Sequence, residues 1–168
     1  MAKEILWFER KLDFGKPKEM LPYYLERLEG TISRIKTKVN GVADSLLSAQ
    51  HNGKWSVKQN IGHLAEVDEI ANRRIDEIIS GVSPMSPAVF EPKLNYNEMS
   101  ITDVIQFFTE RRKSNLKKYA ELLDEDLMKS SLHPRLKVMM TAVDLAWFDA
   151  EHDDHHLVKI NFILNQFK

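Results

Sequence analysis

Three histidines of this 168-residue chain have a spacing that suits a metal-binding site. His152 and His156 are four residues apart in a segment with helical periodicity, so their imidazoles lie one turn apart on the same face. Two imidazoles placed in this way can bind one cation at ~2.0–2.1 Å each. His63 lies in a second expected helix, on a stripe that is otherwise apolar. If these helices are neighbours, three neutral imidazoles converge and leave coordination positions open for water or substrate.

Two carboxylates lie at helical spacing from these histidines. Asp149 precedes His152 by three residues and is aligned to orient that imidazole through a hydrogen bond. Glu66 follows His63 by three residues. Either carboxylate could also transfer protons as a catalytic acid or base, and helical spacing alone selects both.

The acidic run beside the histidine pair is less informative. His152, Asp153 and His156 spell His-Asp-x-x-His, one methylene short of the zinc-peptidase motif His-Glu-x-x-His, which is a weak match. Asp153 lies about 100° around the helix from His152. We therefore expect Asp153, Asp154 and His155 to face solvent.

Four segments with helical periodicity must position these residues. Pro22 suits the first turn of the first helix, and Ser56 with Gln59 forms a capping box for the second. No segment reads as a strand. We expect an all-α fold, a four-helix bundle with a long crossover loop between helices 2 and 3, and a single domain over residues 1–168. The expected helices run from Leu21 to Asn40, from Ser56 to Gly81, from Ser100 to about Asp124 and from Thr141 to Leu164.

Three connecting segments remain open to interpretation. The crossover, residues 81–99, contains three prolines and is long for a compact bundle, so it is either a wall of the substrate site or a surface connection. The segment from Trp7 to Gly15 is expected to lie across the bundle and to bury Trp7, Phe8 and Phe14. His133 precedes a proline in the last connection and could cap a helix, approach the metal or face water.

The composition narrows the function classes. With 24 basic and 25 acidic residues the chain has no strong field that would favour nucleic acid or an anionic membrane as a partner. The absence of cysteine excludes disulfides, thiolate ligands and a cysteine nucleophile. The first residues lack the apolar core of a signal peptide, so we expect a cytoplasmic protein.

Five stretches carry a more specific pattern: Trp7–Lys11 with Asp13 and Phe14, Glu26–Thr31, Lys54–Leu64, His133–Leu136 and Glu151–Leu157. Together they resemble the DinB-like (DinB/YfiT-like) metalloenzyme superfamily. The resemblance implies a four-helix bundle with a three-histidine site, often for zinc or nickel, whose ligands here are His63, His152 and His156. It also implies homodimers in many cases.

The reaction is less specified by this resemblance. Relatives include S-transferases that use small thiols such as bacillithiol or mycothiol, and a mycothiol-dependent isomerase. We therefore expect a small-molecule substrate and, as the first hypothesis, a transferase with a low-molecular-weight thiol cosubstrate. The alternatives are a hydrolase that uses a metal-bound water, and a non-catalytic metal- or ligand-binding protein. The crossover residues 90–97 lack the histidines that many relatives carry there, so the substrate can differ.

Overall fold

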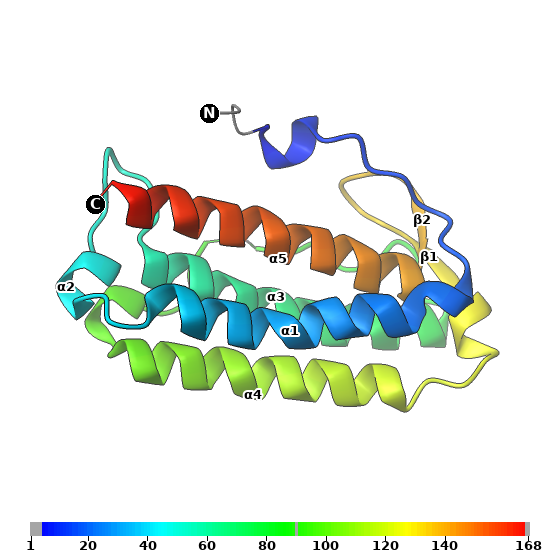
Figure 1. The fold of residues 1–168 in the computed structure, drawn as a ribbon. Coiled ribbons are helices and arrows are strands. Elements are labelled where there is room, and N and C mark those ends of the chain that lie inside the picture. The colour runs from blue at the N-terminus through cyan, green and yellow to red at the C-terminus, as the bar shows by residue number, and fades with distance from the viewer. Residues whose placement is uncertain (1–4, 90, 167–168) are drawn as a thin grey trace.

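A computed structural model describes residues 5–89 and 91–166. Figure 1 shows the predicted all-α four-helix bundle, which is thereby confirmed. Its long helices are α1 (Leu21–Val39), α3 (Val57–Ser80), α4 (Ile101–Ala120) and α5 (Ala142–Asn165). The connections contain α2 (Asp44–Leu47), the short 3-10 helices η1 (Trp7–Glu9), η2 (Lys18–Met20), η3 (Tyr96–Glu98) and η4 (Asp126–Met128), and the strands β1 (Ser130–Leu132) and β2 (Met139–Thr141).

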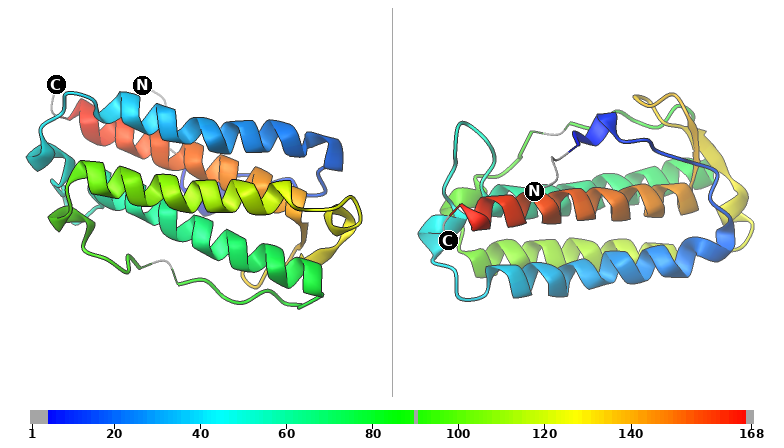
Figure 2. Two further views of the ribbon diagram at one scale, coloured as in Figure 1. Left: turned by 90° about the horizontal axis from the view of Figure 1, so that it is seen from below. Right: turned by 45° about the horizontal axis from the view of Figure 1, so that its top comes forward.

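The order of the helices around the bundle explains the long crossover. Both α1 and α3 pack against α4 and α5, so α1 and α3 occupy opposite corners. The neighbours α3 and α4 run in the same direction (Figure 1). Since the 24-residue α3 is about 36 Å long, the chain must return along the whole bundle before α4 can begin. Residues 81–89 and 91–99 belong to this return, and they run beside the bundle in Figure 2.

Local signals define most helix ends. The Ser56 hydroxyl accepts the N–H of Gln59, and the Gln59 side chain accepts the N–H of Ser56, which is the predicted capping box. The expected end of α4 near Asp124 is wrong, because the helix ends at Ala120. The Asp126 carboxylate accepts the N–H of Leu123 and starts a separate turn there.

A layer of buried charge crosses the middle of the bundle. Arg112 of α4 is 1% exposed and donates from Nε to Asp68 of α3 at 2.9 Å. It also donates from Nη1 to Asp153 of α5 at 2.6 Å and to the carbonyl oxygen of Leu28 of α1 at 2.7 Å. The Thr31 hydroxyl of α1 donates to the same Asp153 carboxylate at 2.6 Å. One guanidinium therefore connects all four long helices.

This layer divides the apolar core into two clusters. The side chains of the layer come from Thr31, Asp68, Arg112 and Asp153, one from each long helix. In each helix, this residue lies between a residue of one cluster and a residue of the other. The flanking pairs are Leu28 and Ile35 in α1, Ala65 and Ala71 in α3, Phe108 and Tyr119 in α4, and Ala150 and Leu157 in α5.

The crossover docks on α3 through Tyr96, which is fully buried. A Cβ atom added at Gly62 would lie 2.4 Å from the Tyr96 ring, so only glycine allows this approach. The Tyr96 hydroxyl donates to Glu66 Oε1 at 2.7 Å, and the N–H of Lys93 donates to the same oxygen at 2.7 Å. These contacts hold the crossover against the face of α3 that carries Gly62 and Glu66.

The N-terminal segment lies across the bundle as expected, with one exception. Asp144 Oδ1 accepts the N–H groups of Gly15 and Lys16 at 2.7 and 2.8 Å, which ties the segment to the first turn of α5. Trp7 and Phe14 are partly buried and pack against aromatic rings of α5. Phe8 is 49% exposed, so its predicted burial is wrong. Its ring instead lies under the guanidinium of Arg135, 3.6 Å from the Arg135 Cζ.

The prediction that the chain has no strands is also wrong. Strands β1 and β2 pair antiparallel, with Ser131 opposite Met140. Each strand has three residues, which is too short for an alternating pattern to be visible in the sequence. The hairpin carries His133 to the side of the bundle, where its N–H donates to the Val138 carbonyl at 2.8 Å.

Within the described ranges, no helix combines the length and the apolar character that crossing a membrane requires.

We predict that Arg112→Met strongly destabilises the fold. The substitution leaves the carboxylates of Asp68 and Asp153 buried without their cation, and breaking a buried pair in this way costs about 3–5 kcal/mol. Urea denaturation of the metal-free protein measures the change in the free energy of unfolding.

The control is Arg111→Met, the same substitution one residue earlier in α4. Arg111 is half-buried with its guanidinium over the Phe107 ring, a contact worth about 0.5–1 kcal/mol at an exposed site. Equal losses for the two variants, or a loss below about 1 kcal/mol for Arg112→Met, would contradict the role of the charged layer.

Candidate metal centre

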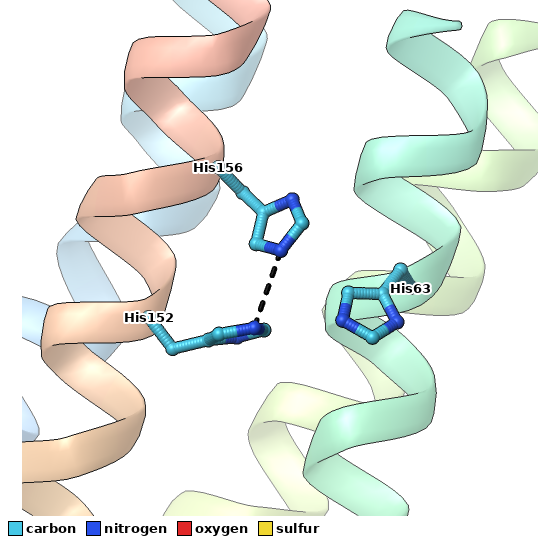
Figure 3. Close-up of side chains that lie close together, drawn as sticks. All are labelled: His63, His152 and His156. Atoms are coloured by element: carbon cyan, nitrogen blue, oxygen red, sulfur yellow. Dashed lines mark hydrogen bonds between the residues drawn. The ribbon is translucent and has the colours of Figure 1, made fainter. Parts of the chain in front are cut away.

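His63, His152 and His156 converge between α3 and α5, as the helical spacing predicts. Figure 3 shows the three rings turned toward one another. One ring nitrogen from each histidine lies within 4.8 Å of the other two, and His152 Nε2 is 3.2 Å from His156 Nε2. Two nitrogens bound to one tetrahedral cation at ~2.0–2.1 Å lie roughly 3.3–3.4 Å apart. The two histidines of α5 are therefore already spaced as a pair of ligands.

Burial keeps these imidazoles neutral. All three histidines are less than one-tenth exposed. Desolvation lowers the pKa of His63 to about 4 and the pKa values of His152 and His156 well below the usual range. The neutral ring is the form that binds a metal, so no proton has to be displaced at neutral pH.

Asn60 orients one of the rings. Its Nδ2 donates to the Ser56 carbonyl at 2.8 Å, so its Oδ1 is the atom that faces His156 Nδ1 at 2.7 Å. An amide oxygen only accepts, which places the proton of the neutral His156 ring on Nδ1 and leaves the lone pair on Nε2. A hydrogen bond of this kind typically supports a metal-binding histidine. Sequence reasoning missed this role of Asn60, although a polar residue one turn before His63 on an apolar stripe was a visible signal.

A cavity of about 200 Å³ opens beside the three histidines. Trp55 packs on His63 with ring centroids 4.8 Å apart, and Trp7 packs edge-on against His152 at 5.1 Å. Most of the remaining wall is apolar. The other lining residues are Phe8, Val67, Ile70, Ala71, Arg74, His133, Arg135, Leu145, Phe148, Asp149, His155 and Lys159.

The two candidate carboxylates occupy different places. Asp149 lines the cavity and is 4% exposed. Desolvation raises the pKa of Asp149 well above its usual range. The expected hydrogen bond to His152 is not formed: within the described chain, Asp149 Oδ2 and His152 Nδ1 are both buried without a hydrogen-bond partner. Glu66 is not among the described residues that line the cavity, and its Oε1 accepts from Tyr96 and Lys93 of the crossover.

The expectation that Asp153, Asp154 and His155 face solvent is wrong for two of the three. Asp153 is 1% exposed because it pairs with Arg112 of the charged layer. His155 is 6% exposed and packs beside Trp7 with ring centroids 5.6 Å apart. Asp154 is half-buried in ion pairs with Arg27 and Arg34 of α1.

The crossover does not contribute to this cavity. Among the described residues, the lining comes from the N-terminal segment, from Trp55, from α3, from the β1–β2 connection and from α5, and none of it from residues 81–99. The reason is the docking of Tyr96 on the face of α3 that carries Gly62, about 100° around the helix from His63. His133, whose role the sequence left open, lies in the cavity wall instead.

Known proteins share this fold. YfiT from Bacillus subtilis, described as a probable metal-dependent hydrolase with an unusual four-helix bundle topology, superimposes with a TM-score of 0.80 at 19% identity over 94% of this chain and 93% of its own. A mycothiol-dependent maleylpyruvate isomerase superimposes with a TM-score of 0.67 at 12% identity, over 83% of this chain and 60% of its own. At these identities the two superpositions show a common fold.

The sequence itself also has relatives. A protein of Oceanobacillus iheyensis named "Putative metal-dependent hydrolase OB0413" is 24% identical over 150 residues, which cover 84% of each chain. The family model of the DinB superfamily matches residues 27–160, a range that contains all three converging histidines. With the bundle topology and the buried histidine cluster on the same helices, this match shows that the chain belongs to the DinB superfamily.

Proposed function

We propose that this protein is a metal-dependent hydrolase of a small molecule, with a divalent cation held by His63, His152 and His156. The observation that carries the proposal is the convergence of three neutral imidazoles at the wall of a mostly apolar cavity. Three histidines leave at least one coordination position open, which is the arrangement of a catalytic site and not of a closed structural one.

A divalent cation at this site supplies Lewis acidity and lowers the pKa of a water molecule to about 7. The protein supplies the surroundings. Asn60 holds the His156 ring with Nε2 as the free donor atom. Trp7 and Trp55 cover the histidines and limit the access of bulk water. Asp149 lines the same cavity, and one of its carboxylate oxygens has no hydrogen-bond partner among the described residues. Because burial also raises its pKa, we assign it the role of proton acceptor.

Hydrolysis has more support than thiol transfer, the reaction that the sequence resemblance favours. Two of the similar proteins carry names that describe metal-dependent hydrolases. The similar protein whose name mentions a thiol shares only the fold, at 12% identity. The choice of zinc or nickel, a thiol cosubstrate and a homodimer all stay predictions, as does a catalytic role for Glu66.

We predict metal-dependent hydrolysis that needs all three histidines. Protein stripped of metal and reloaded with Zn²⁺, Ni²⁺, Co²⁺ or Mn²⁺ is assayed with nitrophenyl esters, nitroanilides and nitrophenyl phosphates. At least one combination should exceed the metal-free rate by about 100-fold or more, because the open cation site activates water. Elemental analysis should find about one ion per chain, and His63→Ala, His152→Ala or His156→Ala should lose both ion and activity.

The control is His51→Ala, which removes an exposed histidine of the loop before α3 and should change neither quantity. The same preparations are offered monochlorobimane with several small thiols. Metal-dependent conjugation without hydrolysis of any substrate would contradict the hydrolase and support the transferase. Metal binding without either reaction would support a binding protein.

We also predict that Asn60→Leu weakens metal binding by about 10- to 100-fold, because His156 loses the hydrogen bond that orients it. Competition with a chromophoric chelator measures the affinity. Asn60→Asp keeps an oxygen acceptor for His156 Nδ1 and should stay within a few-fold of the wild-type protein. If the aspartate variant loses as much affinity as the leucine variant, an oxygen acceptor opposite His156 Nδ1 is not what supports metal binding, and the orienting role is wrong.

A further inference from the structure

The cavity has a second polar end, away from the three histidines. Residues His63, Val67, Ile70 and Arg74 follow one another at helical spacing and line it along a single face of α3. Arg74 comes three turns after His63, about 16 Å along the helix axis, and its side chain leans back toward the helix N-terminus. The middle of the cavity is therefore apolar, with a histidine cluster at one end and a guanidinium at the other.

Arg74 is a buried cation whose Nε has no acceptor among the described residues. It is 5% exposed, and its Nε is buried without a hydrogen-bond partner. Within the described ranges, no hydrogen bond and no ion pair joins Arg74 to another residue. A buried charge is costly unless it is paired and hydrogen-bonded. A guanidinium that lines a cavity in this condition is ready to bind an anion from outside.

His133 adds a donor at the same end. Its Nδ1 accepts the backbone N–H groups of Leu136 at 3.1 Å and of Arg135 at 3.3 Å, so the proton of the neutral ring is on Nε2. Burial, with the nearby charges of Arg74 and Arg135, lowers the pKa of His133 to about 4, which keeps this tautomer neutral at pH 7. His133 is 4% exposed and belongs to the cavity wall.

Asp149 does not satisfy Arg74. The two side chains line the same cavity and interact electrostatically, but no ion pair within 4.0 Å forms between them. Asp149 Oδ2 also has no hydrogen-bond partner in the part of the chain that the structure describes. The charge of Arg74 nevertheless limits the charge that a bound ligand can carry. A single deeply buried guanidinium suits a monoanion better than a dianion, because the second negative charge of a phosphate monoester would be buried without a cation to balance it. Arg135, at the same wall, is exposed to solvent.

We propose that Arg74 and His133 form an anion subsite that binds the carboxylate of the substrate. The planar guanidinium fork matches a carboxylate, and His133 Nε2–H gives a further donor. The substrate class is then a small carboxylic acid with an apolar or aromatic spacer and a hydrolysable bond at the opposite end. The cavity of about 200 Å³ is smaller than the ~300–1,000 Å³ pockets of drug-sized ligands, in keeping with a small molecule. The inference rests on the proposed function only for placing the hydrolysable bond at the histidine end.

The test measures binding to the metal-free protein by isothermal titration calorimetry. The probes are 4-phenylbutyrate, its neutral isostere 4-phenylbutanamide, and 3-phenylpropyl phosphate. We expect the carboxylate to bind about 30-fold more tightly than the amide, since a buried charge-assisted pair is formed only with the carboxylate. We also expect the phosphate to bind more weakly than the carboxylate. Equal binding of carboxylate and amide would overturn the subsite, and tighter binding of the phosphate would overturn the monoanion class.

Variants identify the residues. Arg74→Met keeps the apolar stem and should reduce the preference for the carboxylate to within about threefold, whereas Arg73→Met should retain it. Arg73 is the matched control, because it precedes Arg74 in α3 and its side chain is 50% exposed. If Arg74→Met does not fold, His133→Phe carries the test, with about fivefold weaker carboxylate binding and unchanged amide binding. A folded Arg74→Met variant that keeps the full preference for the carboxylate would overturn the assignment. Unchanged carboxylate binding in His133→Phe would do the same.

The outcome is separable from that of the proposed function. Without metal, the calorimetry reports only on the anion subsite. A carboxylate preference in a protein that hydrolyses nothing would overturn the hydrolase and leave the subsite standing. Metal-dependent hydrolysis with no preference between charged and neutral probes would overturn the anion subsite and leave the hydrolase standing.

Discussion

The ion network of Arg112 is the constraint on which the rest of the structure depends. A single buried guanidinium bonds to a carboxylate of α3, a carboxylate of α5 and a carbonyl of α1, and it projects from α4. Such a network tolerates little rotation of any helix about its axis, because a buried charge left unpaired is costly. With Asp153 facing Arg112, His152 and His156 lie roughly 60–100° around α5, on the side that faces α3. With Asp68 facing Arg112, the stripe that carries His63 and Arg74 lies about 120–140° around α3. The charged layer thus aims both halves of the histidine cluster at the same space.

Short-range patterns predicted the parts of this molecule that depend on short-range physics. The period of 3.6 residues located the four helices and put His152 and His156 on one face, and the Ser56–Gln59 pair marked the start of α3. The family resemblance selected the same three histidines. What these patterns could not supply is the partner of a side chain that comes from elsewhere in the chain. Asp153 reads as one acidic residue in a polar run, because the arginine that buries it lies 41 residues away in another helix.

The same limit accounts for the other differences. Strands of three residues are too short to show a periodic pattern, so the hairpin that brings His133 into the cavity could not be predicted from the sequence. The sequence of the long crossover is compatible both with a wall of the substrate site and with a surface connection. The position of the crossover depends on the contact between the Tyr96 ring and Gly62, which no residue of the crossover indicates on its own. The N-terminal segment and the hairpin, not the crossover, complete the cavity. In the two proposals made above, these two segments and Arg74 determine which substrate binds, while the histidines on α3 and α5 determine the reaction.

The central claim is that His63, His152 and His156 together hold one divalent cation. The most direct measurement is anomalous X-ray diffraction from crystals of the zinc-loaded protein, recorded on both sides of the zinc absorption edge. The account predicts one strong anomalous peak about 2.0–2.1 Å from a ring nitrogen of each of the three histidines, with His156 bound through Nε2 and its Nδ1 still on Asn60. A zinc-loaded protein with no peak between α3 and α5, or with the ion bound by residues other than these three, would contradict it.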